Sequence, residues 1–445
     1  MTKYEKIVLT IVLLSYFVTA IDSSIVLTAL TKIATDLKLD QTSLSWIQNA
    51  YILAFGGFIL LGGRLGDVFG RKRIINIALL LFGIGSALAG WATDAATMIF
   101  ARFVQGVGAA IMAPTSLALL MDTFSGDKRV KAVAWYSSIS GLGSCIGLVL
   151  GGVLASYTSW RYGFYINVPL TLFMLYLSQT TLKQPMLLKQ PFDIVGTLLS
   201  VTGIFGLVYA INGAAQPLLW FILSLVLLVS FVFVEARSRV AIMPLELFQS
   251  KTRCKAYLAR TMYMCAMLGF WFYLSQYLQE VLHFSPIMAG IAFFPMTISL
   301  FAAAMLVPVL VADYGNKNVL LLGVSFLACG MLLVLRLTEG STYLGGVAVP
   351  LVLLGFGQGL SMSPMTNLGI DNTHADIAGA ASGMVNVTHQ IGGSIGLAIM
   401  VALSKDLPSM MNSFHMAMTI GFAFILLMGM LALSFKDGQQ PELEQ

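Results

Sequence analysis

The sequence is dominated by long apolar runs that carry few or no charges. A helix needs about 20 apolar residues to cross the hydrocarbon core of a membrane. Runs of roughly this length or longer occur at about 7–31, 46–63, 74–93, 95–121, 132–160, 162–182, 194–234, 261–279, 284–312, 318–335, 340–370, 377–404 and 407–435. Because the apolar residues are continuous rather than alternating, the runs favour helices over barrel strands. We therefore expect an all-α integral membrane protein.

The run at 194–234 is too long for a single crossing. Asn212-Gly213 and Gln216-Pro217 lie near its middle and favour a turn. We interpret the run as a two-helix transmembrane hairpin, which brings the expected total to fourteen transmembrane helices. An even number of crossings leaves both termini on one side, and most Lys and Arg residues fall in loops on that side. The positive-inside rule therefore predicts a multi-pass plasma-membrane protein with both termini in the cytoplasm.

Two polar stretches, Lys183 to Asp193 and Glu235 to Arg260, divide the chain. They predict an N-terminal six-helix bundle at 1–182 and a linker at 183–255 that carries the inserted hairpin at about 194–234. A C-terminal six-helix bundle with a short cytoplasmic tail follows at 256–445. The stretches "GRLGDVFGRKR" (63–73) and "VLVADYGNKN" (309–318) are weakly similar and occupy equivalent loops. Paired halves of this kind are typical of secondary transporters.

The sequence gives little support for an enzyme, a metalloprotein or a nucleic-acid-binding protein. The chain has no Gly-x4-Gly-Lys-Ser/Thr phosphate loop and no Gly-x-Ser-x-Gly elbow. Its four cysteines show neither metal-ligand spacing nor a disulfide framework. The net charge of +5 is accounted for by cytoplasmic loops. We therefore predict no enzymatic activity, no cofactor, no metal site and no nucleic-acid partner.

Asp22 is the only charged residue in the first apolar run. A carboxylate at the bilayer centre costs about 2.5–3.5 kcal/mol on insertion scales, so it is a functional candidate. Arg102 is the only charge in the fourth run, and the helical rise places both residues at a similar depth. A structural ion pair is one interpretation. We favour a proton site, in which Asp22 is ionised beside Arg102 and protonated when the two separate.

A polar stripe marks "GMVNVTHQIGGSIG" (383–396). Asn386, His389, Gln390 and Gly393 share one helix face, which we expect to point into a bundle. His389 either titrates near neutral pH, as a proton-coupling residue, or makes a neutral hydrogen bond, and both interpretations stay open.

Small residues recur at helical spacing in the fifth run. Gly143, Gly147 and Gly151 stand four residues apart. Such a face permits close helix packing, which we favour, or forms a bending or sliding surface between the halves.

Aromatic and amide residues suggest a binding pocket. The stretches "FWFYLSQY" (270–277) and "FFPMT" (293–297) are suited to line an adaptable pocket for flat, apolar solutes, although single residues of this kind also face lipid. Our candidate substrate-binding residues are Asn49, Gln105, Trp271, Tyr273, Gln276, Phe293, Phe294, Asn386 and Gln390.

Several motifs resemble one known family. "GGRLGDVFGRKRI" (62–74) resembles the loop motif of the major facilitator superfamily, and "ARFVQGVGAAIMAP" (101–114) its fourth-helix arginine motif. "GSCIGLVLGG" (143–152) is similar to the fifth-helix antiporter motif. Further stretches resemble the fourteen-helix drug:proton antiporter branch, which contains multidrug efflux transporters: "AIDSSIVLTAL" (20–30), "SWRYGFYINVP" (159–169) and "FDIVGTLLS" (192–200). The resemblance covers nearly the whole chain.

The resemblance implies alternating access between two six-helix bundles, with substrate exported and protons returning. It makes Asp22 the first-helix acid and Arg102 its partner. It also implies a cytoplasmic gating cluster, to which we assign Gly63, Asp67, Gly70, Arg71, Arg73 and Asp122, together with the glycines at 143, 147 and 151. The chain departs from the family patterns at three positions: Leu148 and Thr31 replace prolines, and His389 stands where arginine is more usual.

Our leading hypothesis is a proton-coupled exporter of cationic or zwitterionic drug-like amphiphiles, monomeric and in contact with membrane lipids. The proton gradient would drive it, with sodium left open as the coupling ion. A second hypothesis keeps the fold but moves lipid or fatty-acid-like amphiphiles. A third, a membrane-embedded sensor or enzyme without net transport, leaves the paired halves and the loop motif unexplained.

Overall fold

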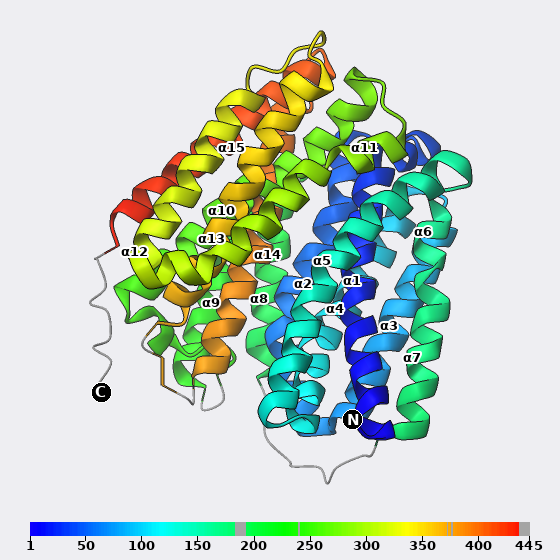
Figure 1. Cartoon of the computed structure of the whole chain (residues 1–445), viewed down its shortest axis with the longest axis vertical. Coiled ribbons are helices and arrows are strands. Elements are labelled where there is room, and N and C mark those ends of the chain that lie inside the picture. The colour runs from blue at the N-terminus through cyan, green and yellow to red at the C-terminus, as the bar shows by residue number, and fades with distance from the viewer. Residues whose placement is uncertain (183–192, 239–240, 372, 375–376, 436–445) are drawn as a thin grey trace. The chain divides into compact units, whose positions relative to one another are not determined.

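The computed structural model describes residues 1–182, 193–238, 241–371, 373–374 and 377–435 (Figure 1). Helices make up all of the regular secondary structure in these described ranges. Contacts group the chain into two units. The first comprises Met1–Ile242 with Phe284–Ile291, and the second Met243–His283 with Ala292–Gln445. Residues 194–234 thus group with the first unit, while the three-part domain division stays a prediction.

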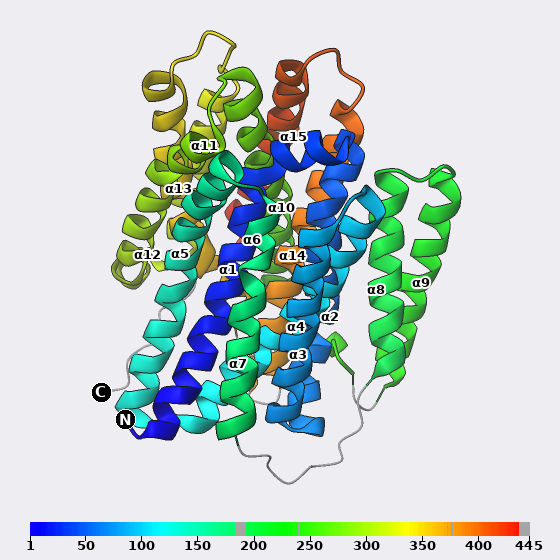
Figure 2. The same ribbon diagram turned by 90° about the vertical axis from the view of Figure 1, so that its right-hand side faces the viewer.

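The first unit is built from long helices that pack side by side. Helix α1 packs against α5 and α4, α2 against α4, and α3 against α4 and α7 (Figure 2). The helices of this unit are α1 (Lys3–Leu37), α2 (Gln41–Phe69), α3 (Arg71–Trp91), α4 (Ala95–Thr123), α5 (Gly126–Tyr157), α6 (Arg161–Tyr165), α7 (Asn167–Thr181), α8 (Ile194–Ile211), α9 (Pro217–Arg237) and α11 (Pro286–Ala292), the last belonging to it as far as Ile291.

Short polar residues and glycine set the helix ends. Asp40 begins α2 by accepting a hydrogen bond from the Ser43 amide at 2.9 Å, and Asp94 begins α4 in the same way through Thr97 at 2.9 Å. Gly70 has a φ of 85°, which suits glycine, and separates α2 from α3. The loop motif therefore lies at a tight helix–helix connection.

Helices α8 and α9 form a packed pair joined through residues 212–216 (Figure 2). The Trp46 Nε1 donates to the Asn212 carbonyl at 2.9 Å, and the Asn212 Nδ2 donates to the Ser45 Oγ at 2.6 Å. Trp46 and Ser45 belong to α2, so these bonds attach the turn to the first unit. Most of α9 remains exposed and apolar, as expected of a surface that lipid covers.

The second unit contains η1 (Leu245–Phe248), α10 (Lys251–Gln276), η2 (Tyr277–Val281), α12 (Phe294–Val334), η3 (Tyr343–Ala348), α13 (Val349–Gly369), α14 (Ala378–Ser404) and α15 (Met410–Leu433). Helix α10 packs against α14 and α15, and α12 against α13 (Figure 1). Gly315 interrupts α12 with a φ of 75°. The break falls between the apolar runs at 284–312 and 318–335.

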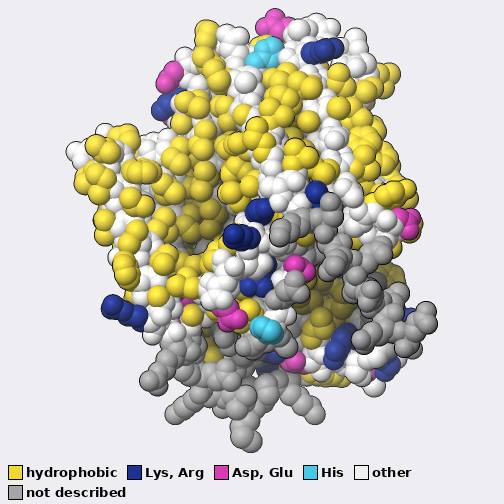
Figure 3. Space-filling model, turned by 90° about the vertical axis from the view of Figure 1, so that its left-hand side faces the viewer, with side chains coloured by type: hydrophobic (Ala, Val, Ile, Leu, Met, Phe, Trp, Pro, Cys, Tyr) yellow, Lys and Arg dark blue, Asp and Glu magenta, His cyan; other side chains and the backbone are white. Residues whose placement is uncertain are grey.

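Within the described residues, ten helical segments are long and apolar enough to cross a membrane. Hydrophobic side chains also cover most of the described surface that Figure 3 presents. This is the surface of a multi-pass membrane protein, because so many exposed apolar side chains would be unfavourable in water. The ten segments do not establish the expected total of fourteen.

Candidate functional site

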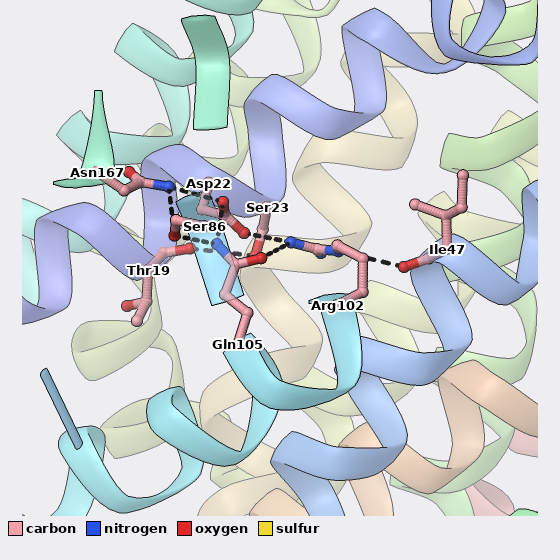
Figure 4. Close-up of polar contacts among 8 residues, drawn as sticks. All are labelled: Thr19, Asp22, Ser23, Ile47, Ser86, Arg102, Gln105 and Asn167. Atoms are coloured by element: carbon pink, nitrogen blue, oxygen red, sulfur yellow. Dashed lines mark hydrogen bonds and ion pairs between the residues drawn. The ribbon is translucent and has the colours of Figure 1, made fainter. Parts of the chain in front are cut away.

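Asp22 and Arg102 form a buried ion pair inside the first unit. The Asp22 side chain is 1% exposed and that of Arg102 is 0% exposed. The Arg102 Nη1 lies 2.6 Å from the Asp22 Oδ2 (Figure 4). The single charges of the first and fourth apolar runs therefore meet, as the depth estimate predicted.

Two amide side chains complete the environment of the Asp22 carboxylate. The Gln105 Nε2 donates to the Asp22 Oδ1 at 2.6 Å, and the Asn167 Nδ2 donates to the same oxygen at 2.9 Å. Both amides also donate to the Ser86 Oγ, at 2.8 and 3.4 Å respectively. Donors from α4 and α7 thus converge on one acid of α1 (Figure 4). This arrangement suits an ionised carboxylate.

Arg102 is held by more than its carboxylate. Its Nε donates to the Ile47 carbonyl of α2 at 3.2 Å, and its guanidinium carbon lies 4.2 Å from the centre of the Tyr51 ring. Phe164 presents a second ring at 5.8 Å. Cation–π contacts and a partner of opposite charge both lower the cost of burying a guanidinium. The Nη2 of Arg102 has no hydrogen-bond partner among the described residues.

The glycine stripe of α5 packs against the helix that carries Asp22. A Cβ atom on Gly147 would lie 2.8 Å from the Ile21 carbonyl oxygen, and one on Gly151 would lie 2.7 Å from the Ile25 Cα. A Cβ on Gly143 would also lie 2.9 Å from the Ala20 Cβ. Only glycine permits so close an approach of α1 and α5. The stripe therefore serves packing within the first unit, and a gating role stays a prediction.

The predicted gating cluster is partly assembled. The Arg71 Nε lies 2.5 Å from the Asp122 Oδ2, with side chains 22% and 54% exposed. Arg73 is exposed, and Gly63 has room around it, since a Cβ there would first meet Pro114 at 3.8 Å. The Asp67 side chain lies outside the described part of the structure, so its part in the cluster stays a prediction.

The predicted substrate residues of the first unit have different surroundings. Gln105 belongs to the Asp22 cluster, and its role in substrate binding stays a prediction. Asn49 is fully buried, and neither its Oδ1 nor its Nδ2 has a partner among the described residues. An unpaired buried amide is costly, which leaves Asn49 a candidate for binding a ligand or water.

The second unit contains a buried arginine that the sequence analysis did not identify. Arg260 of α10 is 7% exposed, and its Nε donates to the His389 Nδ1 at 3.1 Å. Its Nη1 donates to the Met362 carbonyl at 3.1 Å and to the Thr366 Oγ1 at 3.4 Å. His389 of the predicted polar stripe therefore meets α10 through an arginine–histidine contact, whereas Asn386 of the same stripe is exposed and does not point into the bundle.

The remaining predicted residues of the second unit are mostly buried. The Tyr273 hydroxyl lies 2.5 Å from the Ser404 Oγ, and the Gln276 Nε2 donates to the Phe272 carbonyl at 3.3 Å. The Trp271 Nε1 has no partner among the described residues. Phe293 is buried, Phe294 and Gln390 are partly exposed, and Asn386 is exposed. These residues form no single cluster by themselves, so their role stays a prediction.

Sequence reasoning missed several polar members of the two clusters. Asn167 lies within "SWRYGFYINVP", so its motif was a usable signal, whereas Ser86 is an ordinary small polar residue of an apolar helix. Arg260 ends the polar stretch that begins at Glu235, and nothing in that stretch indicated that it would be buried. No group of three or more His, Cys, Asp or Glu side chains suited to a metal occurs in the described part of the chain.

Comparison with known proteins identifies the chain's relatives. Residues 12–397 match the family described as Major Facilitator Superfamily. The chain is 33% identical to a puromycin resistance protein of Streptomyces alboniger, over 89% of this chain and 81% of that protein. It is 32% identical to a cephamycin export protein of Amycolatopsis lactamdurans, over 88% and 83%. An auto-inhibited POT family peptide transporter shares its fold, with a TM-score of 0.71, 15% identity and coverage of 99% and 98%.

Proposed function

The chain belongs to the major facilitator superfamily and is a transporter rather than an enzyme, and we propose that it exports drug-like cationic or zwitterionic amphiphiles in exchange for protons. Relatives named for antibiotic resistance and export support the cargo class. The family implies alternating access, with no cofactor beyond an ion gradient. We further propose fourteen transmembrane helices, both termini in the cytoplasm, and a monomer.

The observation that carries the proposal is the buried Asp22 carboxylate. It accepts hydrogen bonds from Arg102, Gln105 and Asn167, all inside a membrane-embedded helix bundle. A carboxylate surrounded by donors is stable as an anion. Withdrawal of those donors would leave it in an apolar setting, where the protonated acid is favoured. Movement of α1 relative to α4 would therefore load or release one proton.

Coupling follows from competition for the same charge. A cationic substrate near Asp22 favours the ionised acid, whereas protonation removes the attraction. Substrate and proton would therefore bind in alternation, which is the requirement for exchange. Among the described residues, Asp22 is the only acid that pairs with Arg102, so we propose a small number of protons per cycle.

The experiment uses purified protein in tight vesicles that contain a pH-sensitive dye. A pH gradient is imposed, ethidium is added, and proton flux and dye movement are recorded together. We expect ethidium to trigger proton movement in the wild-type protein and none in Asp22→Asn, because the amide cannot exchange a proton. Asp406→Asn removes an exposed acid that forms no ion pair with the described residues and provides the matched control.

Three other outcomes of this experiment would change or overturn the proposal. Gradient-driven ethidium transport by Asp22→Asn would remove this residue from proton coupling. If the wild-type protein moves ethidium only with a sodium gradient, the coupling ion is wrong although the exporter assignment stands. Failure to transport cationic, zwitterionic and fatty-acid-like amphiphiles under either gradient would overturn the proposal.

A further inference from the structure

Arg260 is a buried cation that lacks an acidic partner. Its three hydrogen bonds go to His389, Met362 and Thr366, all of which offer neutral acceptors. No carboxylate in the described part of the second unit forms an ion pair with it. A guanidinium stays protonated, so this buried site carries an uncompensated positive charge.

The contact with Arg260 also determines the state of His389. The guanidinium can only donate, so the His389 Nδ1 must accept, and the proton of the neutral ring lies on Nε2. The His389 Nε2 and the Arg260 Nη2 have no hydrogen-bond partner among the described residues. The arginine–histidine contact therefore contains two nitrogen donors, one from each residue, that have no acceptor among the described residues.

A third donor lies on the same side of α10. Tyr263 follows Arg260 by three residues and so faces the same way along the helix. Its side chain is fully buried, yet its hydroxyl has no partner within the described residues. Unpaired buried polar groups and unpaired buried charges are both unfavourable, and both would be satisfied by one anionic acceptor.

We propose that Arg260 and His389 bind the carboxylate of an amphiphilic substrate, with the Tyr263 hydroxyl as a further donor. The inference rests on the proposed export function and specifies the substrate class further. Arg260 supplies the charge and the unpaired N–H groups of its Nη2, which suit a carboxylate. His389 stays neutral and orients the guanidinium. Zwitterions would then be recognised by the second unit through their acidic group.

The test measures binding rather than transport, so that it does not depend on the exporter assignment. The full-length protein is placed in phosphatidylcholine nanodiscs. A fluorescent xanthene dye with a free benzoic acid is compared with the methyl ester of the same dye by fluorescence polarisation. Arg260→Gln and Arg260→Lys are compared with the wild type, and the exposed Arg336→Gln is the matched control.

We expect the wild-type protein and Arg336→Gln to bind the acid about tenfold more tightly than the ester, the size of a charge-assisted hydrogen bond. Arg260→Gln should lose this preference while still binding the ester, which shows that it is folded. Arg260→Lys keeps the charge but not the planar fork, so it should retain part of the preference. If Arg260→Gln does not fold, the reduced preference of Arg260→Lys still tests the site.

Equal binding of acid and ester by the wild-type protein would overturn the inference, as would a full preference in Arg260→Gln. Repeating the measurement in phosphatidylglycerol nanodiscs separates a substrate from a lipid headgroup. Complete loss of the wild-type preference there would assign the site to lipid and overturn the substrate proposal. Vesicle transport of the ester by Arg260→Gln would test the export function separately.

Discussion

Arg102 of the first unit and Arg260 of the second are both buried in long helices, but they face different partners. Arg102 meets the Asp22 carboxylate at 2.6 Å, so the pair is close to neutral. Arg260 meets His389 at 3.1 Å and keeps its full charge. The charges of the first cluster balance without a ligand, although the Arg102 Nη2 has no partner among the described residues, whereas the second cluster lacks an anion. Under the two proposals above, this difference distinguishes an ion-coupling site at Asp22 from a site at Arg260 that recognises a charged substrate.

The two clusters are similar in how their helices pack. In the first unit, Gly147 of α5 allows close approach to Ile21, next to Asp22. In the second, a Cβ on Gly392 of α14 would lie 2.5 Å from the Thr261 carbonyl oxygen, next to Arg260. Close backbone contact fixes the position of each charged helix. The clusters therefore differ in electrostatics more than in packing.

Removing Arg102 should have the largest effect on stability. Arg102→Gln leaves the Asp22 carboxylate buried without a cation, and breaking a buried pair in this way costs about 3–5 kcal/mol. We expect a fall of that size in the free energy of unfolding, measured by detergent-induced unfolding of the purified protein. The double variant Asp22→Asn/Arg102→Gln should be more stable than Arg102→Gln, because no carboxylate is left unpaired. If the free energy of unfolding of Arg102→Gln lies within about 1 kcal/mol of the wild-type value, the buried ion pair is not important for stability.

Replacing the closely packed glycines with alanine should lower the stability of both units by an intermediate amount. Gly147→Ala and Gly392→Ala each place a Cβ against backbone of the neighbouring helix, and overpacking of this kind costs about 1–3 kcal/mol. Gly379→Ala is the control in α14, since its Cβ would have nothing within 4 Å. Thermal unfolding of the three variants measures the difference. A Gly392→Ala variant as stable as Gly379→Ala would show that α10 and α14 pack less closely.

The sequence predicts a site residue only where its charge or polarity differs clearly from that of its neighbours along the chain. Asp22 and Arg102 are single charges in apolar runs, so hydropathy and helical rise were enough to pair them. Arg260 follows several charged residues, and that composition resembles a loop although α10 begins at Lys251. Ser86 carries no such contrast, because hydroxyls are common in membrane helices and bond to their own backbone. Which polar groups meet is decided by helix packing, which local composition does not encode.

Removing Arg260 should have a smaller effect on stability than removing Arg102. Arg260→Gln gives up hydrogen bonds to His389, Met362 and Thr366, each worth about 0.5–1.5 kcal/mol. It also removes an uncompensated buried charge, which offsets much of that loss. We expect a net change of less than about 1 kcal/mol in the same detergent assay used for Arg102→Gln. A loss as large as that of Arg102→Gln would mean that Arg260 is mainly structural.

The partly exposed pair between Arg71 and Asp122 should have the smallest effect on stability, because water reaches it and screens the two charges. Asp122→Asn should cost less than about 1 kcal/mol. The effect should fade in high salt, whereas that of Arg102→Gln should not, since salt screens exposed charges far more than buried ones. Unfolding at low and high salt measures both. If Asp122→Asn nevertheless slows vesicle transport severalfold, its contribution lies in the difference between transport states rather than in folding. Unchanged transport would remove Asp122 from the proposed gate. The buried charges of Asp22, Arg102 and Arg260 would then remain as the main electrostatic determinants of the proposed transport cycle.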